Sequence, residues 1–494
     1  MILVREIDPA DLALFDEWYD AFRAGAVAGR EAALVVGREA LGFSLRNPGL
    51  LKHRIAVGAF EDDRVLGAML FEYRLTDNLD TVEAEIDVPP EHRRRGIGTA
   101  LWQWAVTRSA QLGRTIVQCE LGVPSEPWPG AAFAERLGFQ VEHVEEHLVV
   151  PLPYDALRLE ELQEAAGRLD GYRLTSWAGI CPPEHQQAYA DLHTAMDRDV
   201  PTGGMTREVV PWTVEKLQAS EQRIDRNYLA LVTMAHTDAG DPAGYTLLYL
   251  PRADVDHAQQ DDTLVLREHR GHNLGTHLKL ANLQQLAEHR TTQRFLHTWT
   301  ALANTPMRKV NARFGFRPVE EHRELELRLP RLRPAARAVL LDPDDRVLLV
   351  RFEFSSGTLW ATPGGGVEAG ETLVEGLRRE LVEEVGLELH ADPQHIWHQE
   401  VVADGHATRY DGVINDYFLV RADAFEPAGT LTLAELRAEN VHELGWWTLA
   451  ELRAHDGRFS PRELPALLQR LLESGPPSTP TQLGLLGVDR SQSS

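Results

Sequence analysis

Three carboxylates at helical spacing are the side chains of this chain best placed to do chemistry. Glu380, Glu383 and Glu384 stand at positions i, i+3 and i+4, so on a helix they share one face. Leucines recur every four residues over 373–381, which indicates an amphipathic helix. Like charges on one face repel unless a hard divalent cation lies between them, and Mg²⁺ prefers such oxygen ligands. The spacing therefore predicts a metal-binding helix.

The residues around this helix complete a longer pattern. Gly365 lies in a run of glycines ahead of the helix, where a backbone without Cβ atoms can approach a ligand. Gly386 follows the helix, at the place where a left-handed residue commonly ends one. The fixed positions are Gly365, Glu371, Arg379-Glu380-Leu381, Glu383-Glu384 and Gly386-Leu387. They resemble the Nudix box, the signature of hydrolases of nucleoside diphosphates linked to another group, and they fill each of its positions.

The resemblance implies a Nudix α/β/α sandwich over 331–475 that hydrolyses a pyrophosphate link with Mg²⁺ or Mn²⁺. It implies metal ligation by Glu380, Glu383 and Glu384, catalytic roles for Glu383, Glu380 and Arg379, and structural roles for Gly365, Glu371 and Gly386. Arg379 would orient the glutamates, and from a helix it also reaches toward Glu375 and Glu383. Glu383 is our first choice of general base, and the choice stays open because the base varies among Nudix enzymes.

Other residues of this region have two interpretations. Trp360, Tyr417, Trp446 and Trp447 could stack on a nucleobase, although aromatic residues on strands more often belong to the core. Glu439 and Glu443 are further acidic candidates for the site.

A second chemical motif lies in the first part of the chain. Over 81–88, apolar residues alternate with Glu83, Glu85 and Asp87, which predicts a strand with one buried and one acidic face. A strand-to-helix turn follows, formed by Arg93, Arg94, Arg95, Gly96, Ile97, Gly98 and Thr99. Glycines in such a turn let consecutive N–H groups face one anion, and the dipole of the helix adds to the attraction.

With Ala132-Phe133 and Leu137-Gly138-Phe139 further on, this turn resembles the GNAT acetyltransferase superfamily over about residues 1–150. In that superfamily a Gln/Arg-x-x-Gly-x-Gly/Ala turn holds the pyrophosphate of acetyl-coenzyme A. The resemblance implies cofactor binding by Val88, Arg93, Arg94, Arg95, Gly96, Ile97, Gly98 and Thr99. Glu85, or Glu83 in its place, would accept the proton of an amine acceptor, and a solvated strand face is the other interpretation.

The thiolate acid of many GNAT enzymes is absent from its usual position. Those enzymes carry a Tyr four residues before the Gly-Phe pair, and this chain carries Ala134 and Asn311 there. Deprotonation of the acceptor would therefore have to carry the catalysis.

An internal repeat predicts a second copy of this unit. Glu91-His92-Arg93 recurs as Glu268-His269-Arg270, Gly98-Thr99 as Gly275-Thr276, and Gly138-Phe139 as Gly315-Phe316, each 177 residues later. A fixed offset across separated blocks is what duplication leaves. The arrangement is similar to tandem GNAT proteins of the mycothiol-synthase type, and it places a second cofactor turn at Arg270, Gly271, Asn273 and Gly275. Asn273 replaces Gly96 and its side chain would crowd the anion, so the first turn is the better pyrophosphate site.

The fold class expected is α/β and α+β multidomain, with two GNAT-like mixed sheets flanked by helices and then the Nudix sandwich. The expected domains are residues 1–152 and 171–330 for the GNAT units, 153–170 for a linker helix, 331–475 for the Nudix unit and 476–494 for a disordered tail. The net charge of −25 argues against a nucleic acid polymer as a partner. Only two cysteines and no apolar run of membrane length predict a cytoplasmic protein without a membrane partner.

The sequence thus favours a bifunctional enzyme, an acetyl-CoA-dependent N-acetyltransferase with an amine acceptor and an Mg²⁺-dependent hydrolase with a nucleotide-type substrate. The alternative is a Nudix hydrolase whose GNAT units are acyl-CoA sensors or scaffold modules. A third possibility is that coenzyme A, itself a nucleoside diphosphate derivative, is the shared ligand. The acyl acceptor, the Nudix substrate and the oligomeric state stay open.

Overall fold

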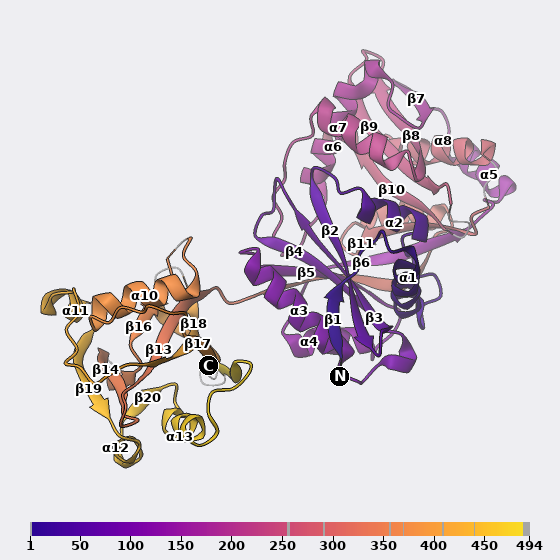
Figure 1. Cartoon of the computed structure of the whole chain (residues 1–494). Helices are drawn as coiled ribbons and strands as arrows, with labels where there is room; N and C mark the ends of the chain where they lie inside the picture. Colours follow the sequence, from indigo (N-terminus) through magenta and orange to yellow (C-terminus); the bar gives the residue numbers. More distant parts are fainter. Residues whose placement is uncertain are drawn as a thin grey trace. The chain divides into compact units, whose positions relative to one another are not determined.

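A computed structural model describes residues 2–253, 257–289, 292–354, 357–368, 370–407, 410–438 and 440–487. The chain divides into two compact units, Met1–Leu329 and Pro330–Ser494. Figure 1 colours the first unit from indigo to pink and the second from orange to yellow.

One mixed sheet of 12 strands runs through the described part of the first unit. Its strands are β1 Leu3–Glu6, β2 Lys52–Glu61, β3 Arg64–Arg74, β4 Thr81–Asp87, β5 Ile116–Val123, β6 Gln140–Pro151, β7 Tyr172–Ala178, β8 Tyr228–Thr237, β9 Pro242–Pro251, β10 His257–Val265, β11 Phe295–Ala301 and β12 Arg317–Arg328. The α-helices are α1 Leu12–Val27, α2 Arg38–Arg46, α3 Ile97–Gln111, α4 Pro129–Leu137, α5 Ala156–Ala166, α6 Gln186–Asp199, α7 Val214–Ile224, α8 Leu274–Glu288 and α9 Thr305–Arg313.

Helices cover both faces of this sheet because the strand residues alternate between two apolar clusters. In the first half, Val57 of β2 packs with α3, whereas its neighbour Ala56 packs with α1. In the second half, Leu231 of β8 packs with α8, and Val232 packs with α6 and α7. Figure 1 shows α1 and α3 on opposite sides of the first strands. Each strand-to-helix turn is therefore fixed between a buried strand and a buried helix.

The two halves of the sheet exchange their last strands. The strand order is β1-β2-β3-β4-β5-β12-β6-β11-β10-β9-β8-β7, so β12 lies beside β5 and β6 lies beside β11. β6 and β12 pair with each other antiparallel at the centre. The sequence ranges 1–152 and 171–330 therefore do not form two separate sheets. The first range contributes β6 to the second half of the sheet, and the second range contributes β12 to the first half. The segment between them contains the helix α5, whose Leu159 and Leu162 pack on the core of the second half.

The second unit is a sheet between helices. Its strands are β13 Leu332–Leu341, β14 Val347–Phe354, β15 Gly357–Ala361, β16 Gly364–Gly366, β17 Gln394–Ala407, β18 Tyr410–Arg421, β19 Val441–Trp447, β20 Arg458–Ser460 and β21 Thr481–Gly487. Its helices are α10 Leu373–Glu384, α11 Leu433–Ala438, α12 Leu449–Ala454 and α13 Leu464–Ser474. Leu340 of β13 packs against α10, and its neighbours Val339 and Leu341 pack against α13. This layering is the α/β/α sandwich expected from the sequence.

The last residues differ from the expectation of a disordered tail. Residues 481–487 form β21, which pairs parallel with β17, and Leu483 packs against the cluster of α13. A short apolar segment beside an open strand edge gains backbone hydrogen bonds that its composition does not reveal. Residues 488–494 lie outside the described part of the chain.

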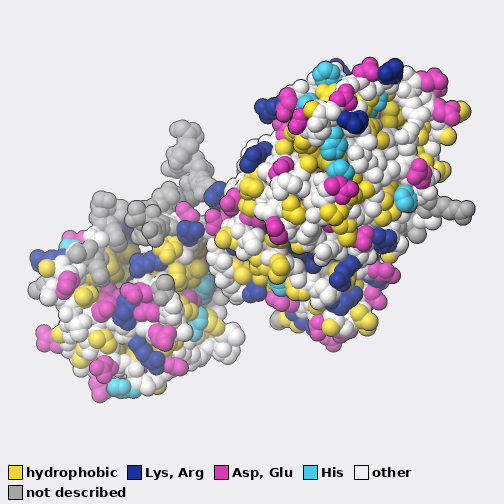
Figure 2. All heavy atoms as spheres, turned by 90° about the horizontal axis from the view of Figure 1, so that it is seen from above, with side chains coloured by type: hydrophobic (Ala, Val, Ile, Leu, Met, Phe, Trp, Pro, Cys, Tyr) yellow, Lys and Arg dark blue, Asp and Glu magenta, His cyan; other side chains and the backbone are white. Residues whose placement is uncertain are grey.

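Two properties of the molecule bear on its partners. Within the residues that the structure describes, no helix is long and apolar enough to cross a membrane. On the face seen in Figure 2, acidic side chains in magenta are interspersed with the dark blue basic ones. Charges of both signs are therefore mixed on the face shown.

Candidate active sites

Helix α10 forms where the sequence predicted it, with a defined start and end. Thr372 caps its N-terminus, and Glu375 completes a capping box by accepting a hydrogen bond from the Thr372 amide at 2.8 Å. Gly386 has φ +76 just beyond the helix, and the Leu387 amide donates back to the Leu381 carbonyl at 3.1 Å. The carboxylate of Glu375 is used in this capping box. It therefore does not pair with Arg379, although the helical spacing would allow that contact.

Arg379 connects most of the predicted catalytic residues. It forms two hydrogen bonds with Glu371, at 2.9 and 3.1 Å, and its NH1 donates to Glu380 at 2.8 Å and to Glu383 at 3.1 Å. NH2 also donates to the carbonyl of Gly366 at 2.8 Å. These hydrogen bonds hold the pKa of Glu371 down, at about 2, and raise that of Arg379. The arginine thus ties the helix to the glycine strand β16 and keeps the carboxylate of Glu371 ionised.

The remaining glutamate of the set is buried against the same strand. Glu384 is 4% exposed and its Oε2 accepts the amide hydrogen of Gly364 at 2.8 Å. The carboxylate of Glu380 lies so close to Gly365 that a Cβ atom on this glycine would come within 2.5 Å of it. A larger residue at position 365 would therefore displace the carboxylate of Glu380.

The structure does not gather the three predicted metal ligands into one cage. Among the described residues, no group of three His, Cys, Asp or Glu side chains is arranged to hold a metal ion. The reason is visible in the contacts, since Arg379 holds Glu380 and Glu383 while the Gly364 amide holds Glu384. The donor set still fits a hard divalent cation, because all three are carboxylates on one face of α10 beside a strand without side chains.

The other residues predicted for this region lie in the core or on its surface. Trp360 and Tyr417 are buried in the cluster under α13, and Trp447 packs on Trp360 at a centroid distance of 4.8 Å. Trp446 donates to the carbonyl of Phe425 at 3.0 Å. These are the contacts of core residues, as the second interpretation expected. Glu443 forms an ion pair with Arg351 at 3.0 Å, and Glu439 lies outside the described residues.

A histidine–carboxylate pair on β17 and β18 was missed from the sequence. His398 Nδ1 lies 2.7 Å from the carboxylate of the buried Asp416, and Glu400 is 3.7 Å from its other nitrogen. The hydrogen bond to Asp416 raises the pKa of His398 to about 9. The two residues are cross-strand partners 18 positions apart, which only the register of β17 and β18 brings together.

His398→Gln is expected to destabilise the protein most under acidic to neutral conditions. Because the pKa of His398 is raised above its usual value, the stabilisation is complete below about pH 6.5 and is lost as the pH rises through about 9. We expect a loss of about 1–2 kcal/mol at pH 6 and little at pH 10. Melting temperatures of the variant and of His442→Gln on β19 at both pH values test this. Equal losses at the two pH values would contradict the ion pair.

The turn after β4 has the geometry of an anion site. Gly96 has φ +83, a left-handed conformation that favours glycine, and α3 begins at the next residue. Ala100 is the first residue of α3 whose amide donates backward, to the Gly96 carbonyl at 2.9 Å. The amides of Ile97, Gly98 and Thr99 are thus those that a helix leaves unpaired at its start. A Cβ atom on Gly96 would meet no atom within 4 Å, so the turn is open to solvent.

The three arginines of the turn after β4 have different contacts, and not all of them point toward the amides of residues 97–99. Arg93 Nε donates to the carbonyl of Val88 at 2.9 Å, which ties the turn to the end of β4. Arg95 pairs with Glu61 at 2.6 Å, and Arg94 has φ +63 and an exposed side chain. The predicted residues Val88 and Arg93 therefore shape the turn, whereas the backbone of 96–99 offers the amides.

The second turn repeats this backbone with different chemistry. Asn273 has φ +57 and Gly271 has φ +88, and Arg270 donates to the carbonyl of Val265 at 3.0 Å, as Arg93 does to Val88. The side chain of Asn273 accepts a hydrogen bond from Thr276 at 2.6 Å, so it lies over the first turn of α8. Asp199 pairs with Arg270 and places a negative charge beside the turn.

These contacts make the second turn the poorer anion site. An amide side chain lies at the start of the helix, and an acidic partner neutralises the nearby arginine. No pattern of spacing points to Asp199, which lies at the end of α6. Gly275 lies in the first turn of α8, as its position in the repeat predicts.

The acidic residues of β4 form a cluster with perturbed ionisation. The side chains of Glu83 and Glu85 are exposed, yet the protein atoms around them partly shield their carboxylates from water. This desolvation raises the pKa of Glu83 to about 7 and of Glu85 to about 8. Burial also raises the pKa of Asp87 to about 7, and the charges of Asp87 and Glu120 act on Glu85 in the same direction. A carboxylate with a pKa near neutrality is suited to general acid–base chemistry.

The structure places no tyrosine at the two positions where the family would have its acid. Ala134 is buried in α4, and Asn311 in α9 is buried with its Nδ2 donating to Thr300 at 2.8 Å. Neither side chain can supply a proton to a thiolate in the way a phenol does.

Comparison with known families gives matches in both units. The model of the Acetyltransferase (GNAT) family matches residues 16–139 and 194–316, which together make up half of the chain. The NUDIX domain model matches residues 331–468. The duplicated matches agree with the internal repeat and with the two halves of the 12-stranded sheet.

Individual proteins also resemble parts of the chain. A solved structure described as a tandem GNAT protein from the clavulanic acid biosynthesis pathway, without AcCoA, is 28% identical with a TM-score of 0.56, and the match covers 66% of this chain and 98% of that one. Phosphatase NudJ of Escherichia coli K12 and that of Shigella flexneri are each 39% identical over 69 residues, which are 14% of this chain. The match spans only 44% of the length of these curated relatives.

Proposed function

Since the chain belongs to the acetyltransferase (GNAT) family and carries a C-terminal Nudix domain, we propose that it is a bifunctional enzyme. One activity transfers an acetyl group from acetyl-coenzyme A to an amine. The other hydrolyses a nucleoside diphosphate linked to another group and depends on Mg²⁺ or Mn²⁺. The observation that carries the proposal is that one chain contains both an open glycine turn at the start of α3 and, in its other unit, a helix α10 whose carboxylates are held by Arg379.

In the hydrolase, the chain's own residues have distinct tasks. Glu380, Glu383 and Glu384 would hold the divalent cation, which when bound offsets charge on the pyrophosphate oxygens. Arg379 positions two of these carboxylates and Glu371 positions Arg379. Glu383 is 36% exposed and is our choice of base, because a base must reach both water and substrate. Gly365 leaves room for Glu380, and Gly386 ends the helix.

In the acetyltransferase, the turn at Arg93–Thr99 would bind the pyrophosphate of acetyl-coenzyme A through its backbone amides. The cofactor supplies the acetyl group. Glu85 on the adjacent strand would accept the proton of the amine, directly or through a water molecule, because its raised pKa lets it hold that proton near neutral pH. With Ala134 and Asn311 at the usual positions of the tyrosine acid, this base carries most of the catalysis.

Glu85→Gln is expected to lower kcat/KM for acetyl transfer by about 10²–10³-fold. In the wild type kcat/KM should rise with pH and level off above about 8, since the base must lose its proton before it can act. The rise should vanish in the variant. Glu83→Gln serves as the comparison. If this variant causes the larger loss of kcat/KM, Glu83 is the base in place of Glu85.

Two measurements on the full chain test the proposal as a whole. The first is release of phosphate or nucleoside monophosphate from a panel of nucleoside triphosphates, nucleotide sugars and dinucleotides with Mg²⁺ and with EDTA. The second is calorimetry with acetyl-coenzyme A, followed by amine-dependent release of coenzyme A. Turnover in both supports the bifunctional enzyme. If no substrate of the panel is hydrolysed, the proposed hydrolase activity is contradicted. If acetyl-coenzyme A does not bind, the proposed transferase activity is contradicted.

One specific observation favours a second function for part of the chain. The turn at α8 is partly covered by Asn273 and is paired with Asp199, so the second half is better suited to support or recognition than to catalysis. In the strongest form of this alternative both GNAT halves sense acyl-coenzyme A and the hydrolase is the only enzyme. Binding of acetyl-coenzyme A without transfer to any amine would favour it.

The cytoplasm is the proposed compartment, in agreement with two free thiols, Cys119 and Cys181.

A further inference from the structure

Carboxylates from four strands gather on one face of the sheet, and the functions above use only two of them. Glu83 of β4 lies opposite Gln118 of β5, and two residues further along β5 Glu120 lies opposite Glu324 of β12. Glu324 in turn lies opposite His143 of β6. Direct cross-strand partners, and residues two apart on one strand, point to the same face of a sheet. We call this surface the acidic face, and its members are Glu83, Glu85, Glu120, His143, Glu145, His322 and Glu324.

The strands β4 and β5 stop pairing within the acidic face. Their ladder joins only residues 81–83 to residues 116–118, although β4 continues to Asp87 and β5 to Val123. Glu85 and Glu120 therefore lie on strand segments that are no longer joined by hydrogen bonds. The side chain of Glu120 is 73% exposed, so this part of the face is accessible to a solute.

Two segments are attached at the two ends of the acidic face. Along β12, Glu320 pairs with Arg30 of the α1–α2 loop at 2.5 Å. Glu326 accepts hydrogen bonds from the amide and the hydroxyl of Thr206, both at 2.8 Å. The stretch from 320 to 326 spans about 20 Å, and the members of the face on β12 lie between these two contacts and are partly exposed.

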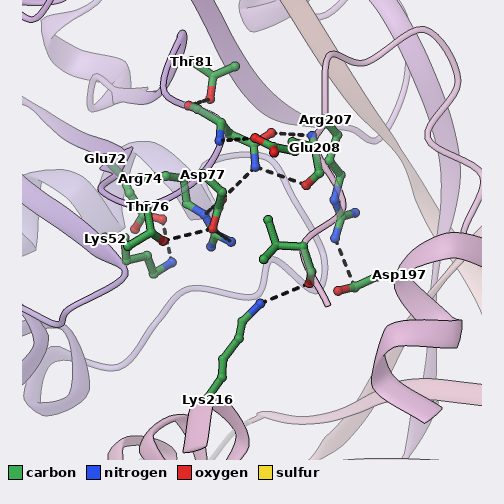
Figure 3. A network of polar contacts seen from close by, with 12 residues as sticks. Lys52, Glu72, Arg74, Thr76, Asp77, Thr81, Asp197, Arg207, Glu208 and Lys216 are labelled. Carbon is green, nitrogen blue, oxygen red and sulfur yellow. Dashed lines mark hydrogen bonds and ion pairs between the residues drawn. The ribbon is translucent and has the colours of Figure 1, made fainter. Parts of the chain in front are cut away.

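The second of these segments, residues 200–213 between α6 and α7, is held in place by further contacts. Gln118 donates from Nε2 to the carbonyl of Thr206 at 2.8 Å. The amide of Glu208 donates to the side chain of Asn78 at 2.7 Å, and Figure 3 shows the polar network around this contact. A segment of the second half thus borders a site in the first half.

Several carboxylates of the acidic face have no partner. His322 pairs with Glu120 at 3.4 Å. Glu83, Glu85 and Glu324 form neither a hydrogen bond nor an ion pair within the part of the chain that the structure describes. Carboxylates that lose water without gaining a partner carry an electrostatic cost, and a positive charge beside them would reduce it.

The basic side chains around the face are paired with carboxylates outside it. Lys52 and Arg54 both pair with Glu72, and Arg30 pairs with Glu320. Among the described residues, the histidines of the acidic face are therefore the only basic side chains that pair with its carboxylates.

The far end of the face also contains a buried nitrogen without a partner. The side chain of His143 is 10% exposed, and its Nε2 has no hydrogen-bond partner within the described residues. This nitrogen lies 3.7 Å from Glu145 Oε1, which is longer than a hydrogen bond. Burial raises the pKa of Glu145 and of Glu324, and the negative charge of Glu120 acts on both in the same direction. This end of the face thus has polar groups that a ligand could satisfy.

We propose that the acyl acceptor of the first half is an aliphatic diamine or polyamine, with one amine at Glu85 and a second ammonium at Glu324 and Glu145. Neighbouring strands lie about 4.8 Å apart, so the carboxylates form a row across the sheet. A row fits an elongated molecule with a charge at each end, and each unpaired carboxylate gains a charge-assisted hydrogen bond. The inference rests on the acetyl transfer proposed above and adds the chemical class of its acceptor.

The test is calorimetry on the full chain with 1,6-diaminohexane, hexylamine and 6-aminohexanoate, which differ only at the far end of one carbon chain. We expect the diamine to bind about tenfold more tightly than hexylamine, the value of one charge-assisted hydrogen bond. The aminohexanoate should bind most weakly, because its carboxylate meets like charges. Equal affinities for the diamine and hexylamine would overturn the inference.

Variants on β12 and β6 locate the second charge. Glu324→Gln should lower the affinity for the diamine about tenfold and leave that for hexylamine unchanged, which a general loss of structure would not do. Glu145→Gln should act in the same direction. Glu324→Gln should not lower the melting temperature, because it removes a charge that its neighbours repel.

The matched control is Glu321→Gln. Glu321 lies on the same strand and points to the opposite face of the sheet, so its substitution removes the same charge from a chain of net charge −25. We expect no change in the affinity for either amine. Equal losses in Glu321→Gln and Glu324→Gln would overturn the inference, because the diamine would then respond only to the net charge.

Transfer assays separate this inference from acetyl transfer itself. In the transfer, an ammonium loses one proton to Glu85 and a second to the departing thiolate, while the C–N bond of the amide replaces the C–S bond of the thioester. We expect a higher kcat/KM with 1,6-diaminohexane than with hexylamine. Equal values would overturn the inference and leave the proposed transferase intact. Selective binding of the diamine without transfer to any amine would contradict the transferase, and with it the role of the diamine as acceptor.

Discussion

Glu383→Gln is expected to reduce Mg²⁺-dependent hydrolysis by about 10³-fold or more in kcat, with the protein still folded. The substitution preserves the size of the side chain but removes its negative charge. That charge serves as the proposed base and as part of the proposed metal site, and it accepts a hydrogen bond from Arg379 at 3.1 Å. Loss of all three roles at once should act on kcat more than on KM, since the interactions removed are those of the transition state.

The matched control for this experiment lies on the same helix. Glu375→Gln removes one negative charge from α10 as well, and glutamine still serves as the N3 residue of a capping box. We expect its activity to stay within a factor of a few of the wild type. Phosphate release with Mg²⁺ over the nucleotide panel is the measurement. Equal activity of Glu383→Gln and Glu375→Gln would show that the box is not the catalytic site.

Gly96→Ala is expected to weaken binding of acetyl-coenzyme A at least tenfold. At φ +83 an L residue is strained by about 1–2 kcal/mol, and relief of this strain rotates the amides of 97–99 away from a common anion. The new methyl group also projects into the open space at the turn, where a Cβ atom meets no protein atom within 4 Å. The loss should therefore appear in affinity even if the protein remains as folded as the wild type.

Gly113→Ala separates the strain from the binding effect. Gly113 lies just beyond the other end of α3, has φ +69, and also has open space around a Cβ atom. Both variants should lower the melting temperature by a similar amount, whereas only Gly96→Ala should lose affinity in calorimetry. If both lose affinity equally, the effect is global instability and the turn is not the cofactor site. Asn273→Gly adds a third arm, and an increase in binding sites on this variant would show that the second turn is blocked only by its side chain.

The sequence by itself determined the motifs that lie within one continuous stretch. The carboxylate face of α10 follows from the spacing of three glutamates, because helix geometry fixes which residues share a face. The start of α10 and the left-handed Gly386 follow from capping residues next to it, and the conformation of Gly96 follows from a strand, a glycine turn and a helix in immediate succession. The repeat at one fixed offset predicted two related halves for the same reason, since duplication preserves order along the chain.

The tertiary structure alone decided which distant residues meet. The exchange of β6 and β12 places His147 beside Glu320 and His297, residues that are 173 and 150 positions away. In the same way Asp199 reaches the second turn and Asp416 reaches His398. Strand register and helix packing fix such contacts, and a shift of one residue in register would move every side chain of a strand to the opposite face. No local pattern records that choice, so these contacts could be recognised only in the folded protein.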